Sequence, residues 1–165
     1  MSFLLWLEAT RIGTFVREGQ TLLAYPTFTV VHTVGLSIVV GISGVIGARL
    51  AGLAPTMPLA PLKRLFPIIW FGFGLNLISG SGLAMAGAAK TLPNAFFLTK
   101  IVAVFTAVAI LRMMQTRVFR DPEVDNKPLD RTSRMLGVAL LVLWLTAMIA
   151  GRLIGYSVDL IAPTG

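Results

Sequence analysis

The feature that most constrains the fold is the confinement of charged residues to a few short segments. Residues 19–48 contain no Asp, Glu, Lys or Arg, and His32 within them is the only histidine of the chain. Overall, 56% of the residues are hydrophobic and 13% are charged, whereas soluble domains carry about 25% charged residues. A long uncharged run satisfies its backbone in lipid only as a helix or in a closed barrel. We therefore expect an integral membrane protein.

Four apolar segments are long enough to cross a bilayer as helices. At the helical rise of about 1.5 Å per residue, about 20 residues cross the hydrocarbon core. The sequence therefore predicts an all-α membrane protein, with a single membrane domain over residues 1–165 that forms a four-transmembrane-helix bundle. The predicted spans are roughly residues 27–48, 65–86, 95–115 and 132–154.

An amphipathic segment precedes the first span. Within residues 2–18, Leu5 and Val16 share one helical face with other apolar residues, and the charged residues lie largely on another face. This pattern is typical of a helix in the membrane interface, with Trp6 at the depth of the headgroups. A helix packed on the aqueous side of the bundle is the alternative. We expect an N-terminal amphipathic interfacial helix that ends at Gly19–Gln20.

The basic residues indicate an orientation in the membrane. The net charge is +7, and nine of the fourteen Lys and Arg residues flank or lie in the loops that join spans one to two and three to four. Because Lys and Arg are enriched in cytoplasmic loops, we expect the bacterial inner membrane with both termini periplasmic. No basic stripe is interleaved with aromatic residues, so nucleic acid is not an expected partner. The lack of Cys excludes disulfides, thiolate zinc sites, iron–sulfur clusters and c-type haem.

Three ionisable residues fall at one depth, near the outer face: His32 in the first span, Lys100 in the third and Arg152 in the fourth. Such residues are functional candidates because their burial in lipid is costly. A b-type haem would take His32 as its metal ligand, and Lys100 and Arg152 would neutralise the propionates. Gly35 would let the macrocycle approach the backbone. Met85 has a suitable depth for a second axial ligand, and a homodimer with two His32 side chains is the alternative.

Other occupants of this zone are open. A quinone would accept a hydrogen bond from His32 or from Asn76, which lies near mid-membrane in the second span. An anionic substrate or lipid headgroup is a third occupant. With no cofactor, His32 would hydrogen-bond a neighbouring helix, and Lys100 and Arg152 would be snorkelling anchors. The sequence has no paired carboxylates inside a span and no nucleophile, zincin or P-loop motif, so we expect no catalysis by the chain alone.

Three short motifs are spread over most of the chain. They are Tyr25-Pro26 before His32 and Gly35, Asn94-x-Phe96 before Lys100, and Gly151-Arg152 before Tyr156. The chain resembles an uncharacterised family of small four-span bacterial inner-membrane proteins in these motifs. This resemblance implies the four-span fold and an outer-face position for His32, Lys100 and Arg152. The layout also looks like four-helix b-type cytochromes and copper-resistance membrane proteins, but it lacks their several histidines.

Three functions follow as hypotheses. The first is a membrane subunit associated with a redox or electron-transfer complex, with a b-type haem or a quinone near the periplasmic face. The second is a cofactor-free structural subunit of a larger membrane complex, whose small-residue helix faces pack on partners. The third is a small-solute transporter, for which four spans form a path only in an oligomer. The expected partners are the lipid bilayer and either other membrane subunits or further copies of this chain.

Overall fold

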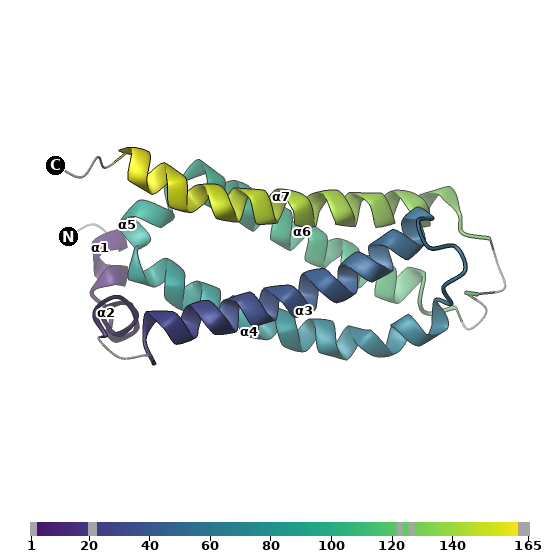
Figure 1. Cartoon of the computed structure of the whole chain (residues 1–165), viewed down its shortest axis with the longest axis horizontal. Coiled ribbons are helices and arrows are strands. Elements are labelled where there is room, and N and C mark those ends of the chain that lie inside the picture. The colour runs from purple at the N-terminus through teal and green to yellow at the C-terminus, as the bar shows by residue number, and fades with distance from the viewer. Residues whose placement is uncertain (1–2, 20–22, 122–123, 126–127, 162–165) are drawn as a thin grey trace.

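The chain folds into a bundle of long helices (Figure 1). The computed structural model describes residues 3–19, 23–121, 124–125 and 128–161, the last four of them by backbone alone. Within these ranges, four helices are long and apolar enough to cross a membrane. The first short helix and the end of the last helix lie at the same end of the bundle. The predicted all-α four-span membrane bundle is confirmed.

Three of the observed helices extend beyond the predicted spans, and the second begins one residue later than predicted. The four helices are α3 (Tyr25–Ala51), α4 (Phe66–Ala86), α6 (Ala95–Arg117) and α7 (Arg131–Ile161). Four short elements flank them: α1 (Phe3–Glu8), α2 (Arg11–Glu18), the 3-10 helix η1 (Ala60–Leu65) and α5 (Ala88–Thr91).

Local chemistry explains where the long helices begin and end. Pro26 occupies the first turn of α3, where its missing N–H costs no helical hydrogen bond. Gly52 ends α3 at φ 93°, a left-handed conformation that favours glycine. Asn94 caps α6 by accepting a hydrogen bond of 2.9 Å from the backbone N–H of Phe96. Pro67 lies in the first turn of α4, directly after η1.

The N-terminal segment differs from the expected single helix over residues 2–18, of which Ser2 lies outside the described residues. The break occurs at Thr10. Its hydroxyl donates to the carbonyl of Leu7 at 2.7 Å and accepts from the N–H of Gly13 at 3.2 Å. The same side chain therefore ends α1 and caps α2, as Ser and Thr commonly do. The predicted break at Gly19–Gln20 extends beyond the described residues, because Gln20 is not among them.

The four spans are arranged as two pairs, α3 with α4 and α6 with α7. The pairs meet through α3 and α7. These two helices approach each other at the end that carries the long loops (Figure 1). There, a Cβ added at Gly137 would lie 2.7 Å from the carbonyl oxygen of Gly47 and from the backbone nitrogen of Ala51. Two glycines thus bring the backbones together at the loop end. The pairs diverge toward the end with α1 and α2 (Figure 1).

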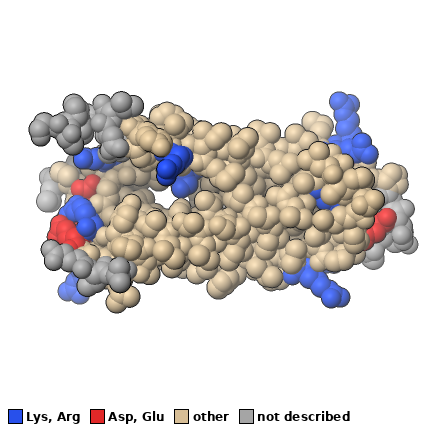
Figure 2. Space-filling view, viewed as in Figure 1, with Lys and Arg blue, Asp and Glu red and all other residues tan. Residues whose placement is uncertain are grey.

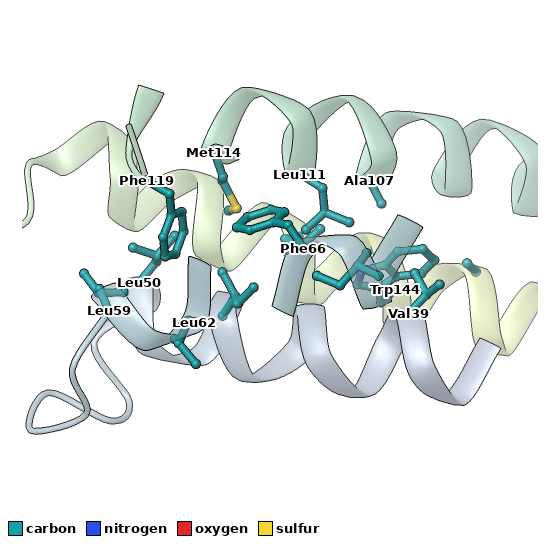
Figure 3. Packing of buried hydrophobic residues seen from close by; sticks show 14 of the residues in the cluster. Val39, Leu50, Leu59, Leu62, Phe66, Ala107, Leu111, Met114, Phe119 and Trp144 are labelled. Atoms are coloured by element: carbon teal, nitrogen blue, oxygen red, sulfur yellow. The ribbon is translucent and has the colours of Figure 1, made fainter. Parts of the chain in front are cut away.

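The buried hydrophobic core extends from the loop end past the middle of the bundle, to Ala103 and Ala147 (Figure 3). The rings of Phe66 and Phe119 meet edge to face at 5.2 Å, with Met114 and Leu111 beside them. The indole N–H of the buried Trp144 has no hydrogen-bond partner among the described residues, so this side chain contributes by packing. Because lipid tails are as apolar as these side chains, close packing rather than exclusion of water stabilises the core.

A carboxylate joins the two long loops at this end. Asp125 accepts hydrogen bonds from the backbone N–H groups of Leu59 and Ala60, the latter at 3.0 Å. Hydrogen bonds from Leu59 and Ala60 hold the pKa of Asp125 below its usual value, with a smaller effect of Arg49 in the same direction. These hydrogen bonds connect the loop after α3 to the loop before α7, across sequence separations of 66 and 65 residues.

Candidate functional site

A cavity of about 320 Å³ lies between the helix pairs, in the half of the bundle near α1 and α2. Side chains of α4 and α6 form most of its wall, and nearly all of the wall is apolar. Figure 2 shows an opening between the helices at this end, with Lys or Arg atoms at its edge. Small residues of α4 explain the space: Gly80, Ser81 and Ala84 line the cavity. In the loop half, Trp70 instead bridges α4 to α6 through a hydrogen bond to Gln115 at 3.2 Å.

The imidazole of His32 occupies the α3 side of this cavity. Its Nδ1 lies 3.2 Å from the carbonyl oxygen of Asn76 and 3.3 Å from the hydroxyl oxygen of Ser79. A carbonyl oxygen only accepts, so Nδ1 carries the ring proton and Nε2 presents a lone pair. That lone pair faces Lys100, whose Nζ is 3.5 Å away. A Cβ at Gly80 would lie 2.9 Å from Cε1 of the ring, so glycine at position 80 makes room for it.

The side chain of Asn76 is hydrogen-bonded to the backbone of His32. Its side-chain amide donates to the backbone carbonyl of His32 at 3.0 Å, within the membrane-spanning part of the bundle. Ser79 is buried, and its hydroxyl donates to the carbonyl of Leu75 at 2.6 Å. Because the Ser79 hydroxyl donates its proton to Leu75, its oxygen can act only as an acceptor toward His32. The α3–α4 contact thus fixes both the rotation and the tautomer of the imidazole.

Lys100 reaches the cavity from the opposite helix pair. Its aliphatic chain runs past Gly151 of α7, where an added Cβ would make an ordinary contact of 3.5 Å with Cδ. Its ammonium has His32 as its hydrogen-bond partner and no carboxylate partner in the described part of the chain. A cation with a neutral partner creates a positive pole in an apolar cavity, and this pole favours an acceptor or an anion.

The other predicted site residues are distributed differently. Met85 lines the same cavity. Arg152 is exposed, with its guanidinium carbon 5.7 Å from the ring centroid of Tyr156, and it is not part of the cavity wall. Gly35 is buried against α4, where an added Cβ would lie 2.8 Å from the carbonyl oxygen of Gly72. Gly35 therefore lies in the α3–α4 contact and not in the cavity wall.

Sequence reasoning did not assign Ser79 or Gly80 to the site. Both follow Asn76 by three or four residues, the spacing that places side chains on one helical face. That spacing is a usable signal once Asn76 is known to face His32. The identity of the facing helix was the missing information.

The short helices α1 and α2 cover the end of the bundle next to the cavity. Leu7 of α1 is part of the cavity wall. The carboxylate of Glu8 accepts a hydrogen bond of 2.8 Å from the backbone N–H of Ala89 in α5 and lies 3.4 Å from Arg17 of α2. One acidic side chain thus attaches the N-terminal helices to the turn between α4 and α6.

No family model, curated protein or solved structure matches this chain. The fold and the cavity define a multi-pass membrane protein with a polar pair, His32 and Lys100, at the wall of an apolar cavity between its spans. Its function has to be inferred from that geometry.

Proposed function

We propose that this protein is an integral membrane subunit of a redox complex and that it binds a quinone headgroup. The observation that supports this proposal is the contact of 3.5 Å between His32 Nε2 and Lys100 Nζ inside a mostly apolar cavity. Small-molecule sites commonly combine an apolar wall with a few polar groups that fix the orientation of the ligand. The volume of about 320 Å³ lies at the lower end of the range for such sites, about 300–1,000 Å³.

The two polar groups suit both redox forms of a quinone. The ammonium of Lys100 is a donor for a quinone carbonyl oxygen, which only accepts. The lone pair on Nε2 of His32 faces Lys100 in the structure, and it would accept from the hydroxyl group of a quinol once the ammonium turns to the ligand. The rings of Phe73, Phe97 and Phe105 line the cavity and offer apolar contacts for a flat ring.

A b-type haem fits these side chains less well. The lone pair of His32 faces the ammonium of Lys100, which stands where an iron would approach. Gly35 is covered by α4, and Arg152 is exposed away from the cavity wall. Met85 lines the cavity as a weak second donor. We therefore favour the quinone.

We further propose that the protein resides in the bacterial inner membrane with both termini periplasmic. In the sequence, nine of the fourteen basic residues flank or lie in the loops between spans one and two and between spans three and four, and such an excess favours the cytoplasmic side. The chain has no Cys, so single cysteines report topology without a background. With intact spheroplasts, a membrane-impermeant maleimide should label Glu18→Cys. Arg117→Cys should be labelled only after lysis, and the reverse pattern would contradict this orientation.

Quinone binding is tested by titrating the purified protein in detergent with menaquinone-4 and following quenching of tryptophan fluorescence. Trp70 is a suitable reporter because its ring packs 6.4 Å from that of Phe73, which lines the cavity. Lys100→Met and His32→Leu should each weaken binding about tenfold, as expected for the loss of one hydrogen bond to a charged or buried partner. Lys90→Met, an exposed lysine at the same end of the bundle, is the matched control.

Two results would overturn the proposal. One is an affinity for menaquinone-4 that is unchanged in both site variants or equally reduced in Lys90→Met. The other is a Soret absorption band in the purified protein that disappears in His32→Leu, because this would assign the site to haem.

A cofactor-free structural subunit is the second candidate. The reciprocal contacts between His32 and Asn76 favour it, since such bonds hold helices in register without any ligand. Co-purification of stoichiometric partner subunits with both wild type and His32→Leu, in the absence of menaquinone binding, would support this function.

A further inference from the structure

We propose that a second site, at the loop end of the bundle, binds a phosphate group between Arg49 and Arg134. A cavity of about 340 Å³ lies between these arginines, with Pro55 and Leu129 in its wall. Its lining is about equally polar and apolar, unlike that of the cavity at His32. This site is at the opposite end of the helices and does not depend on the proposed quinone function.

The fold brings the two arginines together. Arg49 lies in the last turn of α3, and Arg134 lies in the first turn of α7. The contact between Gly47 and Gly137 places these helix ends against each other. Both guanidinium groups therefore stand where spanning helices leave the apolar layer, which is the depth of lipid phosphates.

Neither arginine forms a salt bridge with a carboxylate among the described residues, although Asp125 lies near enough to Arg49 for the two charges to attract each other. Arg49 donates from Nε to the carbonyl of Met57, which orients its guanidinium and leaves the terminal N–H groups for other acceptors. The guanidinium of Arg134 has no partner among the described residues. Asp125 and Asp130 instead accept hydrogen bonds from backbone N–H groups, at Leu59 and Ala60 and at Ser133.

A phosphate group is the ligand that this arrangement suits. The planar guanidinium fork matches phosphate oxygens in bidentate geometry, and two forks from different helices hold a tetrahedral anion from two sides. The apolar wall at Pro55 and Leu129 favours a ligand that also carries apolar groups. Two sources offer this chemistry: the phosphodiester of an anionic phospholipid in the facing leaflet and a soluble phosphate.

The test is native mass spectrometry of the full chain in detergent, with dioleoyl phosphatidylglycerol or dioleoyl phosphatidylcholine added. Wild type should retain phosphatidylglycerol at least about tenfold more strongly than phosphatidylcholine, and the double variant Arg49→Gln/Arg134→Gln should lose this preference. Arg117→Gln/Arg120→Gln, an exposed pair at the same end, should keep it. Arg49→Lys/Arg134→Lys should lose part of it, because lysine keeps the charge without the fork.

Inorganic phosphate in the same experiment distinguishes the two sources. Binding of phosphate that displaces phosphatidylglycerol and depends on Arg49 and Arg134 would assign the site to a soluble ligand. Retention of the lipid alone would assign it to a headgroup. The proposed site would be wrong if wild type retained both lipids equally. It would also be wrong if Arg117→Gln/Arg120→Gln lost the preference for phosphatidylglycerol as fully as Arg49→Gln/Arg134→Gln. Unchanged helical circular dichroism and elution volume establish that the double variant is folded.

Discussion

His32 and Asn76 hold each other across the interface of α3 and α4. The imidazole of His32 donates to the backbone carbonyl of Asn76, and the side chain of Asn76 donates to the backbone carbonyl of His32. The side chain of each residue is thus hydrogen-bonded to the backbone of the other. In lipid, where water offers no alternative partner, this reciprocity sets helix rotation as well as helix distance.

Removal of the amide should therefore loosen the α3–α4 pair. Asn76→Ala is expected to lower the free energy of unfolding by about 0.6–1.7 kcal/mol, between the average and the largest value for hydrogen bonds between membrane helices. The measurement is reversible unfolding in mixed micelles. Ser81→Ala, which loses only a bond to the carbonyl of Leu77 in its own helix, is the control. A cost in Ser81→Ala as large as that in Asn76→Ala would contradict the assignment.

Two glycines of α3 offer a matched pair of substitutions. Gly35→Ala should cost about 1–3 kcal/mol, because the new Cβ would lie 2.8 Å from the carbonyl oxygen of Gly72 and backbone atoms have to move. Gly41→Ala meets nothing within 4 Å and should be neutral or stabilising by up to about 1 kcal/mol, because alanine favours the helix. Thermal unfolding of the two variants side by side measures this. Similar stability of both would show that α3 and α4 are farther apart at Gly35.

The attachment of the N-terminal helices should depend on one carboxylate. Glu8→Ala removes the acceptor of the Ala89 N–H and is expected to speed hydrogen exchange of that amide by about fivefold, equivalent to about 1 kcal/mol. Hydrogen exchange with mass spectrometry of peptides from α1, α2 and α5 gives the readout. The exposed Glu18 also pairs with Arg17, so Glu18→Ala tests for a general effect of charge and should leave Ala89 unchanged.

Acid should weaken the connection between the two long loops. The pKa of Asp125 is lower in the folded chain than its usual value of 3.8, so its contribution to stability is complete above that value and is lost as the pH falls through the lower pKa. Exchange of the Leu59 and Ala60 amides should therefore accelerate below about pH 4. Asp125→Asn, which has no titrating carboxylate, should lose this acid dependence. The same acid dependence in that variant would assign the effect to another carboxylate, such as Asp130, whose pKa is also lowered by its contacts with Ser133.

The spans and the depth of the site could be predicted because both depend on distance along one helix. An uncharged run of residues gives the length of α3, and counting residues from its end places His32 at the depth of Lys100. The side of the helix to which a side chain points could not be predicted, because it depends on the neighbouring helices. Gly151 faces Lys100, and one residue further along the helix turns Arg152 away from it.

The cavity itself could not be predicted for a related reason. It exists because α4 pairs with α3 and α6 pairs with α7, and the small residues Gly80 and Ala84 then face a gap rather than a backbone. The same kind of residue at Gly35 closes a contact. A glycine in a span therefore indicates that another group lies close to the backbone, but the sequence does not tell whether this group is a helix or a ligand. By contrast, the break at Thr10 has a signal in the sequence, since threonine is a favoured N-cap residue.

The grouping of the spans into two antiparallel hairpins has a consequence for how the chain is put together. The short turn of residues 87–94 links a hairpin that contains His32 to one that contains Lys100, while Gly47, Gly137 and Asp125 hold the hairpins together at the far end. Covalent continuity at that turn is thus not needed to align the halves. Two separately encoded fragments, cut there and co-expressed, should reconstitute the assembled protein in the bilayer.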